Sequence, residues 1–203
     1  MSFVQPVTLS HRGIRLEPLA LAHEEGLKAA AADGELWKLR ITSVPEPENT
    51  RKYIEDALKM REEGHRFAFA LMDEATGKVL GSSSYHDILP AVKRVEIGYT
   101  WYAQSVQRTR VNSTCKLMLM THAFEMLQCK TVGWRTDNFN FRSQAAIERL
   151  GARKDGIIRG HALRRDGTIR DTVMYSMTAG EWPEAKAQLI YQLSRPRAAS
   201  ALV

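Results

Sequence analysis

The chain has 203 residues, and its 29 Lys+Arg exceed its 23 Asp+Glu to give a formal net charge of +6. This length suits one large or two small domains, and a hydrophobic content of 44% with 26% charged residues excludes collagen-like, coiled-coil and wholly disordered chains. The longest apolar runs, Phe67–Met72 and Leu117–Met120, are far shorter than the ~18 residues of a membrane-spanning helix. We therefore expect a cytoplasmic protein with no membrane partner.

The basic residues and the cysteines argue against two further classes of site. Positive charge is spread along the chain without a run of five basic residues, so a dedicated nucleic-acid arm is not favoured. Cys115 and Cys129 form neither a metal-binding pattern nor a disulfide framework. We expect no metal.

The first half of the chain predicts a strand, two helices and three strands. The ranges are a strand at Gly13–Pro18, a helix at Ala20–Ala32, an irregular stretch at Leu36–Pro47, a helix at Arg51–Glu63 with Thr50 as N-cap, and strands at Arg66–Asp73, Lys78–Asp87 and Arg94–Tyr102. Short connections favour an antiparallel meander of these three strands. Strict alternation predicts one face of the last strand formed by Val95, Ile97, Tyr99 and Trp101, and the other by Glu96, Gly98, Thr100 and Tyr102.

The second half alternates between helices and strands. The predicted elements are a helix at Val111–Leu127, a strand at Thr131–Thr136, a helix at Phe141–Leu150, a hairpin of Arg153–Arg164 with Ile169–Met177, and a helix at Pro183–Leu193. The strand–helix–strand step from Arg94 to Asp137 predicts a parallel or splayed strand pair. We expect a single α+β domain over residues 1–194, followed by a flexible tail over 195–203.

The segment Trp101–Lys116, WYAQSVQRTRVNSTCK, connects a predicted strand to a predicted helix through a polar loop. Backbone N–H groups and the start of a helix together favour anion binding, and Arg108 and Arg110 add positive charge. An ordinary loop with solvated arginines is the alternative interpretation.

The chain resembles the GCN5-related N-acetyltransferase (GNAT) superfamily, in particular its RimJ/RimL-like branch. The resemblance spans Arg12 to Leu193 and rests on the segments IRLEP, VEIGYTWY, QRTRVN, TDNFNFRSQAAIERLGA and RDTVMYSMTAGEWP. It implies a mixed, mostly antiparallel sheet of six to seven strands with a splayed parallel pair and helices on both faces. It also implies an enzyme that transfers an acetyl group from acetyl-CoA to a primary amine.

The resemblance places the coenzyme pyrophosphate on the loop formed by Gln107, Arg108, Thr109, Arg110, Val111, Asn112 and Ser113. Arg110 and Asn112 stand where the family usually has small residues that let the backbone approach phosphate. Arg110 either turns outward or contacts a phosphate oxygen, whereas Asn112 either adopts unusual backbone angles or caps the helix.

The pantetheine arm is expected between the splayed strands. The resemblance implies pairing with the backbone of Thr100, Trp101 and Tyr102, and further contacts with Asn138, Asn140 and Ser143. The alternative is that Asn138 or Asn140 only caps the following helix.

The implied chemistry is direct attack of a neutral amine on the thioester, with a backbone N–H holding the oxyanion. Glu96 is the first candidate for the base, although it could be only a paired strand carboxylate. His86, Asp87 and His161 are further candidates. Ser143 is the candidate acid. Cys115 is expected to pack, because no covalent step is needed.

The acceptor is expected between Leu36–Pro47 and Ile157–Arg170, near Trp37, Arg40, His86 and His161. A protein N-terminal α-amine and a small-molecule amine both remain open as acceptors. A non-catalytic module that binds coenzyme A or another polyanion is a second class, and a nucleic-acid binder is the least favoured. The resemblance also allows a homodimer.

Overall fold

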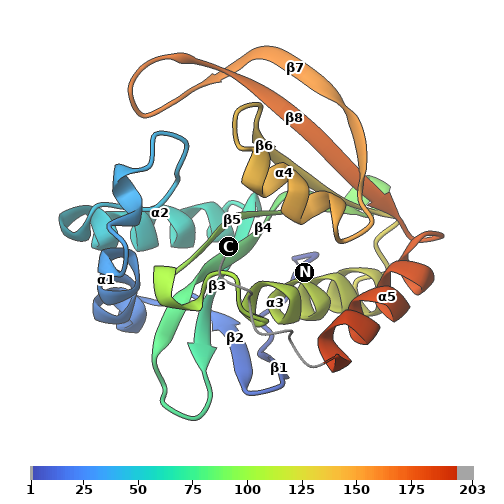
Figure 1. The fold of residues 1–203 in the computed structure, drawn as a ribbon, viewed down its shortest axis with the longest axis horizontal. Coiled ribbons are helices and arrows are strands. Elements are labelled where there is room, and N and C mark those ends of the chain that lie inside the picture. The colour runs from blue at the N-terminus through green and yellow to red at the C-terminus, as the bar shows by residue number, and fades with distance from the viewer. Residues whose placement is uncertain (1, 196–203) are drawn as a thin grey trace, which may run out of the picture.

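The fold is built on a single eight-stranded sheet, seen in the computed structural model, which describes residues 2–195 (Figure 1). The strands are β1 (Leu9–His11), β2 (Ile14–Pro18), β3 (Arg66–Asp73), β4 (Val79–Leu89), β5 (Arg94–Tyr102), β6 (Thr131–Asp137), β7 (Arg153–Leu163) and β8 (Ile169–Thr178). The α-helices are α1 (Glu24–Ala32), α2 (Thr50–Glu62), α3 (Val111–Thr121), α4 (Phe141–Glu148) and α5 (Trp182–Ser194). Apart from Arg195, the expected flexible tail lies outside the described residues.

The strand order confirms the expected mixed, mostly antiparallel sheet. The order is β1-β2-β3-β4-β5-β6-β8-β7, and β3, β4 and β5 form the expected antiparallel meander. Only β5 and β6 pair in parallel among the described strands. The three-residue β1 adds one strand to the six or seven expected, because Leu9–His11 is too short to show an alternating pattern.

Helices cover both faces of the sheet, and β3 shows why. Phe67, Phe69 and Leu71 of β3 pack into the core beneath α3 and α5, whereas Ala68 and Ala70 pack into the core beneath α1 and α2. Successive side chains of a strand point to opposite faces, so a strand buried on both faces is apolar throughout. We call these two sides the α3 face and the α2 face.

The parallel pair of β5 and β6 separates after three residues. The pairing runs from Arg94 with Thr131 to Glu96 with Gly133 and ends there. β6 nevertheless stays paired with β8 as far as Asp137, while β5 stays paired with β4 as far as Tyr102. The two strands therefore splay apart while both remain anchored in the sheet.

A β-bulge at Tyr99 corrects the predicted faces of β5. Ser84 pairs with Gly98 and Ser82 with Trp101, so β5 has one extra residue between these two pairs. Within this stretch Tyr99 adopts a left-handed φ of +49°. A bulge reverses the alternation that follows it. The outcome is that Trp101 packs on the α2 face, and Tyr102 joins Val95 and Ile97 on the α3 face.

Two helix details differ from the sequence expectation. Thr50 is the first residue of α2 rather than its N-cap, because a short 3₁₀ turn brings Asn49 to the cap position. Beyond Thr121, α3 continues as a π-helical segment, His122–Met126.

None of the helices that the structure describes has the length and apolar character needed to cross a membrane.

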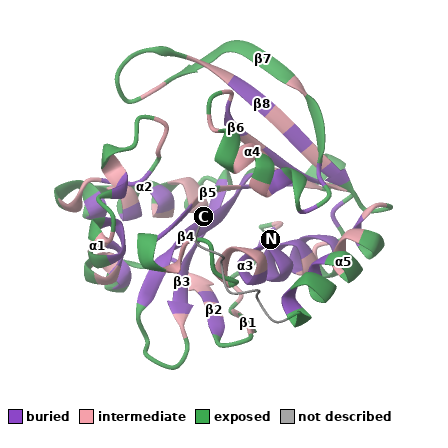
Figure 2. Ribbon diagram, viewed as in Figure 1, coloured by how far each residue is buried: buried purple, intermediate pink, exposed green. Residues whose placement is uncertain are grey.

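The β7–β8 hairpin arches over one end of the sheet and reaches the segment between α1 and α2 (Figure 1). β7 is exposed along nearly its whole length, whereas β8 is partly buried (Figure 2). The Asp166–Gly167 turn forms as predicted, with Gly167 at a φ of +77°. The hairpin tip is therefore held by contacts with the facing segment rather than by the sheet.

Candidate functional site

The loop between β5 and α3 supplies positive charge and the free N-terminus of a helix. Arg108, Thr109 and Arg110 are all exposed, and no acidic residue lies in the first turn of α3. Gln107 Nε2 donates to the carbonyl of Tyr102 at 2.8 Å, which ties the loop to the end of β5. The Thr109 hydroxyl accepts from the backbone N–H of Val111 at 3.2 Å. The arrangement suits a polyanion.

Arg110 and Asn112, which stand where the family loop usually has small residues, both fit with ordinary backbone conformations. Arg110 adopts an ordinary helical φ of −75°, and its guanidinium turns outward to the carbonyl of Arg195. The left-handed residue is Arg108, with a φ of +59°. Asn112 is neither strained nor a cap: it lies within α3, and its side-chain oxygen accepts from the Tyr102 hydroxyl at 3.1 Å.

His86 and Asp87 lie on the α2 face where β5 leaves β6. His86 is 7% exposed, and its Nδ1 is 3.1 Å from the Asp87 carboxylate. A Cβ built on Gly98 would lie 2.2 Å from His86 Nε2, so the ring rests directly against the backbone of β5. The hydrogen bond with His86 and the charge of Arg135 lower the pKa of Asp87.

Glu96 is buried at the last paired position before the splay. Its exposure is 2%, and its two carboxylate oxygens accept from Arg135 Nε at 2.7 Å and from Arg94 at 3.2 Å. Arg135 also bonds Asp87. The acceptor atoms of His86, Asp87 and Glu96 lie within 4.8 Å of one another, and the Arg135 guanidinium supplies the cation for this cluster. Thr100 lies beyond the bulge on the opposite face, so the predicted sharing of a face by Glu96 and Thr100 is wrong.

The turn between β6 and α4 holds the remaining residues expected to bind the cofactor. Asn140 is the N-cap of α4, and its side-chain oxygen accepts from the Ser143 N–H at 3.0 Å. Asn138 is fixed through its backbone, which donates to Asp171 and accepts from the Gln144 side chain. Asn140 is thus a helix cap. Its amide nitrogen has no hydrogen-bond partner among residues 2–195 and could bond a ligand.

The two segments expected to flank the acceptor, Leu36–Pro47 and the tip of the β7–β8 hairpin, contact each other directly. Arg40 Nε pairs with Asp166 at 2.6 Å and Arg40 also donates to Thr168 at 2.8 Å. Arg165 of the hairpin tip donates to the carbonyls of Trp37 and Val44. We call this set of contacts the clasp. Trp37 is partly buried against the α2-face core. His161 is bonded to Thr172 at 3.1 Å, outside the clasp.

Two buried, positively charged side chains near the site, Arg66 and Lys116, were not among the residues predicted from the sequence. Arg66 is 3% exposed; its guanidinium stacks 3.9 Å from the Tyr99 ring and donates to Tyr53 and Ser84. Lys116 is 6% exposed on α3, and its Nζ donates to the Thr100 hydroxyl at 2.9 Å. A signal was present for Lys116, which directly precedes the apolar run Leu117–Met120 inside a predicted helix.

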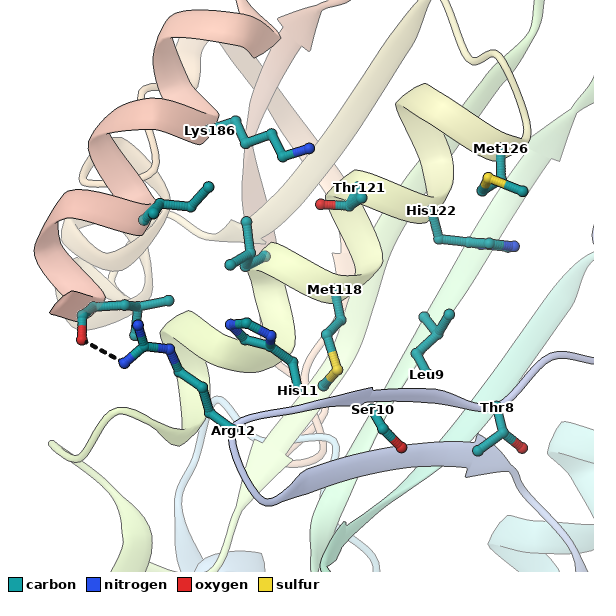
Figure 3. Close-up of a pocket in the computed structure, with 13 residues that line it drawn as sticks. Thr8, Leu9, Ser10, His11, Arg12, Met118, Thr121, His122, Met126 and Lys186 are labelled. Carbon is teal, nitrogen blue, oxygen red and sulfur yellow. Dashed lines mark hydrogen bonds between the residues drawn. The ribbon is translucent and has the colours of Figure 1, made fainter.

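A pocket of about 480 Å³ lies elsewhere, between β1, α3 and α5 (Figure 3). Its lining includes Leu9, Met118 and Ile190, and Arg12 spans one end by donating to the Leu193 carbonyl at 2.9 Å. None of the residues predicted for the site lines it. The predicted site residues instead lie around the splayed strands and the loop that precedes α3.

Comparison with known proteins identifies the family. The model of the acetyltransferase (GNAT) domain matches residues 14–153, which is more than half of the chain. The chain belongs to the GNAT family. It is accordingly an acetyl-CoA-dependent N-acetyltransferase, as the resemblance implied.

Individual GNAT proteins agree with this assignment. YdaF of Bacillus subtilis (strain 168), provisionally assigned as a ribosomal N-acetyltransferase, is 31% identical over 110 residues, which cover 54% of this chain and 59% of YdaF. A GCN5-related N-acetyltransferase from Brucella melitensis is 28% identical, with 94% of this chain and 87% of that chain covered and a TM-score of 0.83. The fold also matches RimJ of Mycobacterium smegmatis in complex with a CoA-disulfide, at 19% identity, 92% and 95% coverage and a TM-score of 0.77.

Proposed function

We propose that this GNAT enzyme binds acetyl-CoA between β5 and β6 and acetylates a protein N-terminal α-amine. The observation that carries the binding site is the splay: β5 pairs with β6 only as far as Glu96, so the next backbone groups of β5 face a gap on that side. Buried backbone N–H and C=O groups need partners. An extended pantetheine arm fits this need, because its amides can pair with Thr100–Tyr102 as an added strand would.

The polyanionic end of the cofactor is proposed at the start of α3. Gln107–Ser113 surround the helix N-terminus, and Arg108 and Arg110 are exposed beside it. On the other side of the splay, Asn140 and Ser143 support the arm from the start of α4. A backbone N–H of the Gly98–Thr100 stretch, beside the bulge at Tyr99, is proposed to hold the oxyanion of the thioester. The binding of CoA by the RimJ and RimL proteins that share this fold supports this proposal.

Two groups are proposed for the base that takes the proton of the attacking amine. Glu96, the candidate from the sequence, has both carboxylate oxygens already engaged by the guanidinium groups of Arg94 and Arg135. His86 is supported more strongly, because Nδ1 is oriented by Asp87 and Nε2 rests against Gly98 at the splay. Glu96 and Arg135 then serve to orient Asp87.

The acceptor is proposed to reach this cluster from the side of the clasp. Ribosomal protein acetyltransferases among the relatives support an N-terminal α-amine. Such an amine has a pKa of about 7.7–8.0, compared with about 10.4 for lysine, so more of it is neutral at pH 7. A small-molecule amine is the alternative acceptor.

The test combines calorimetry with a turnover assay. Acetyl-CoA is titrated into the protein, and CoA release is followed with a thiol reagent against peptides with free or blocked N-termini, lysine-containing peptides and small amines. Binding with turnover only on free peptide N-termini supports the proposal. Turnover only on small amines replaces the acceptor, and binding without turnover on every acceptor supports the non-catalytic module.

A further inference from the structure

Lys116 is a buried cation without a buried anion. Every residue from Thr114 to Met120 of α3 is buried, and Lys116 is 6% exposed. Its Nζ donates to the Thr100 hydroxyl at 2.9 Å, and that hydroxyl lies 2.7 Å from the Ser83 hydroxyl. No carboxylate among residues 2–195 forms an ion pair with it. An ammonium group carries three donors, so two remain for another partner.

The surroundings keep this charge uncompensated. Burial lowers the pKa of Lys116 to about 8. The titratable groups around it are Cys115 on its own helix and Tyr102 on β5, and burial raises the pKa of both. Both are therefore neutral when Lys116 is charged. A buried cation is costly without an anion, so an anion that forms nearby would be strongly stabilised.

The position of Lys116 identifies the anion, given the proposed function. Thr100 follows the bulge at Tyr99, in the part of β5 that has left β6. In the proposed cofactor site the thioester sulfur would lie at this end of the pantetheine arm, and acetyl transfer would release it as a thiolate. His86 and Glu96 lie on the α2 face of β5, whereas Thr100 and Lys116 lie on the α3 face. The base and the cation thus stand on opposite faces of the sheet.

We propose that Lys116 stabilises the departing coenzyme A thiolate and gives it its proton. The neutral amine nitrogen attacks the thioester carbonyl carbon, so a C–N bond forms and the carbonyl electrons move to oxygen. Collapse of this intermediate breaks the C–S bond and leaves the electron pair on sulfur. Lys116 Nζ transfers one proton to that sulfur, while the base takes one proton from the nitrogen. Lys116 recovers its proton from solvent after coenzyme A leaves.

The acidities of the two groups suit this transfer. A free thiol has a pKa of about 8.5, close to the pKa of about 8 that burial gives Lys116. The paired ammonium and thiolate form first, and the proton passes to sulfur as coenzyme A departs, because the two pKa values are similar once the pairing is lost. A serine hydroxyl is a much weaker acid, so this role passes from Ser143, the candidate from the sequence, to Lys116.

The first test needs no turnover. Coenzyme A is bound to the enzyme, and its thiolate absorbance is titrated with pH against a desulfo-coenzyme A complex, which cancels Cys115 and Cys129. An opposite charge within contact distance lowers a pKa by about 1–3 units, so the thiol of bound coenzyme A should ionise at least about tenfold more readily than free coenzyme A. Lys116→Met should abolish this shift. Lys59→Met, whose side chain is 75% exposed on α2, should retain it.

Kinetics separate charge from proton transfer. Lys116→Met should lower kcat by about 10²-fold or more, and Lys116→Arg should keep the shifted thiol while kcat stays low, because arginine does not release a proton. Full turnover in Lys116→Arg would overturn the proton transfer. If Lys116→Met does not fold, Lys116→Gln serves in the same titration.

The outcomes distinguish this inference from the proposed function on which it rests. If the wild-type enzyme binds no coenzyme A by calorimetry, the proposed cofactor site fails. If coenzyme A binds but its thiol ionises identically in the wild-type and Lys116→Met enzymes, only the role of Lys116 is overturned.

Discussion

The imidazole of His86 occupies the space in front of Gly98 that any other side chain would enter. A Cβ at position 98 would lie 2.2 Å from Nε2 and 2.8 Å from Cδ2 of that ring. Gly98 does not adopt a left-handed conformation, so the space and not the backbone requires glycine. The glycine therefore sets where the imidazole sits at the splay.

Gly98→Ala should displace His86 and impair catalysis more than folding. The ring is the end of a side chain that can rotate away, so we expect a stability loss of about 1 kcal/mol, typical of modest overpacking. Losing an oriented base should lower kcat/KM by about 10²-fold. Denaturant unfolding and steady-state kinetics measure the two effects, and acetyl-CoA affinity is the control. The double variant Gly98→Ala/His86→Ala should recover stability without activity; recovery of activity would remove His86 from the reaction.

The base can be assigned from the pH dependence of kcat/KM. Glu96→Gln breaks a buried ion pair and should cost stability of about 3 kcal/mol whether or not Glu96 is the base, so lower activity alone decides nothing. His86→Asn should remove the acid limb of the profile, whereas the limb should persist in Glu96→Gln. The reverse pattern would return the role to Glu96, and an unchanged profile in both variants would exclude the two residues.

Asn140 allows its capping role to be separated from a cofactor role. Asn140→Ala removes the acceptor for the Ser143 N–H and should cost about 1 kcal/mol. Asn140→Asp keeps that acceptor but removes the amide N–H₂ proposed to bond the pantetheine. We expect Asn140→Asp to unfold like the wild type and to bind acetyl-CoA more weakly by calorimetry. Wild-type affinity in this variant would leave Asn140 as a cap alone.

Lys116 should make the stability of the protein depend on alkaline pH. Its pKa is about 8 when folded and 10.5 when exposed, so between these values the unfolded chain binds more protons and stability rises with pH. The cost of burying the charge is complete below about pH 8 and disappears above pH 10.5. Lys116→Met should therefore be more stable than the wild type by up to about 3 kcal/mol at pH 7. Denaturant unfolding at several pH values measures this difference, and a constant difference would contradict the prediction.

The regular elements were largely predictable because their patterns are local. The apolar run of β3 and the alternation in β5 predict strands, and the apolar faces predict α2 and the start of α3 close to their observed bounds. The parallel step from β5 to β6 follows from a single intervening helix. β1 could not be predicted, because its three residues depend on pairing with β2.

The site itself was less predictable, because two of its features arise from tertiary packing. The sequence of β5 alternates without interruption, and nothing in it marks a bulge at Tyr99, where a left-handed tyrosine stacks beneath Arg66. That inserted residue moves Thr100 to the face opposite Glu96. The apolar run after Lys116 indicates that this lysine is buried, but its contact with Thr100 depends on α3 packing against this reversed segment. Asn140 was predicted as a possible helix cap and is one, whereas the faces of β5 beyond Tyr99 could not be assigned.

The clasp closes a ring of chain on the side proposed for the acceptor. The hairpin is joined to the sheet at one end through β8, and the facing segment is joined to it through α1 and α2, while Arg40–Asp166 and the bonds of Arg165 connect the free ends. If the acceptor enters through this ring as proposed, the closed clasp favours chain termini and small amines, which can be threaded through it, over lysines in the middle of a folded protein.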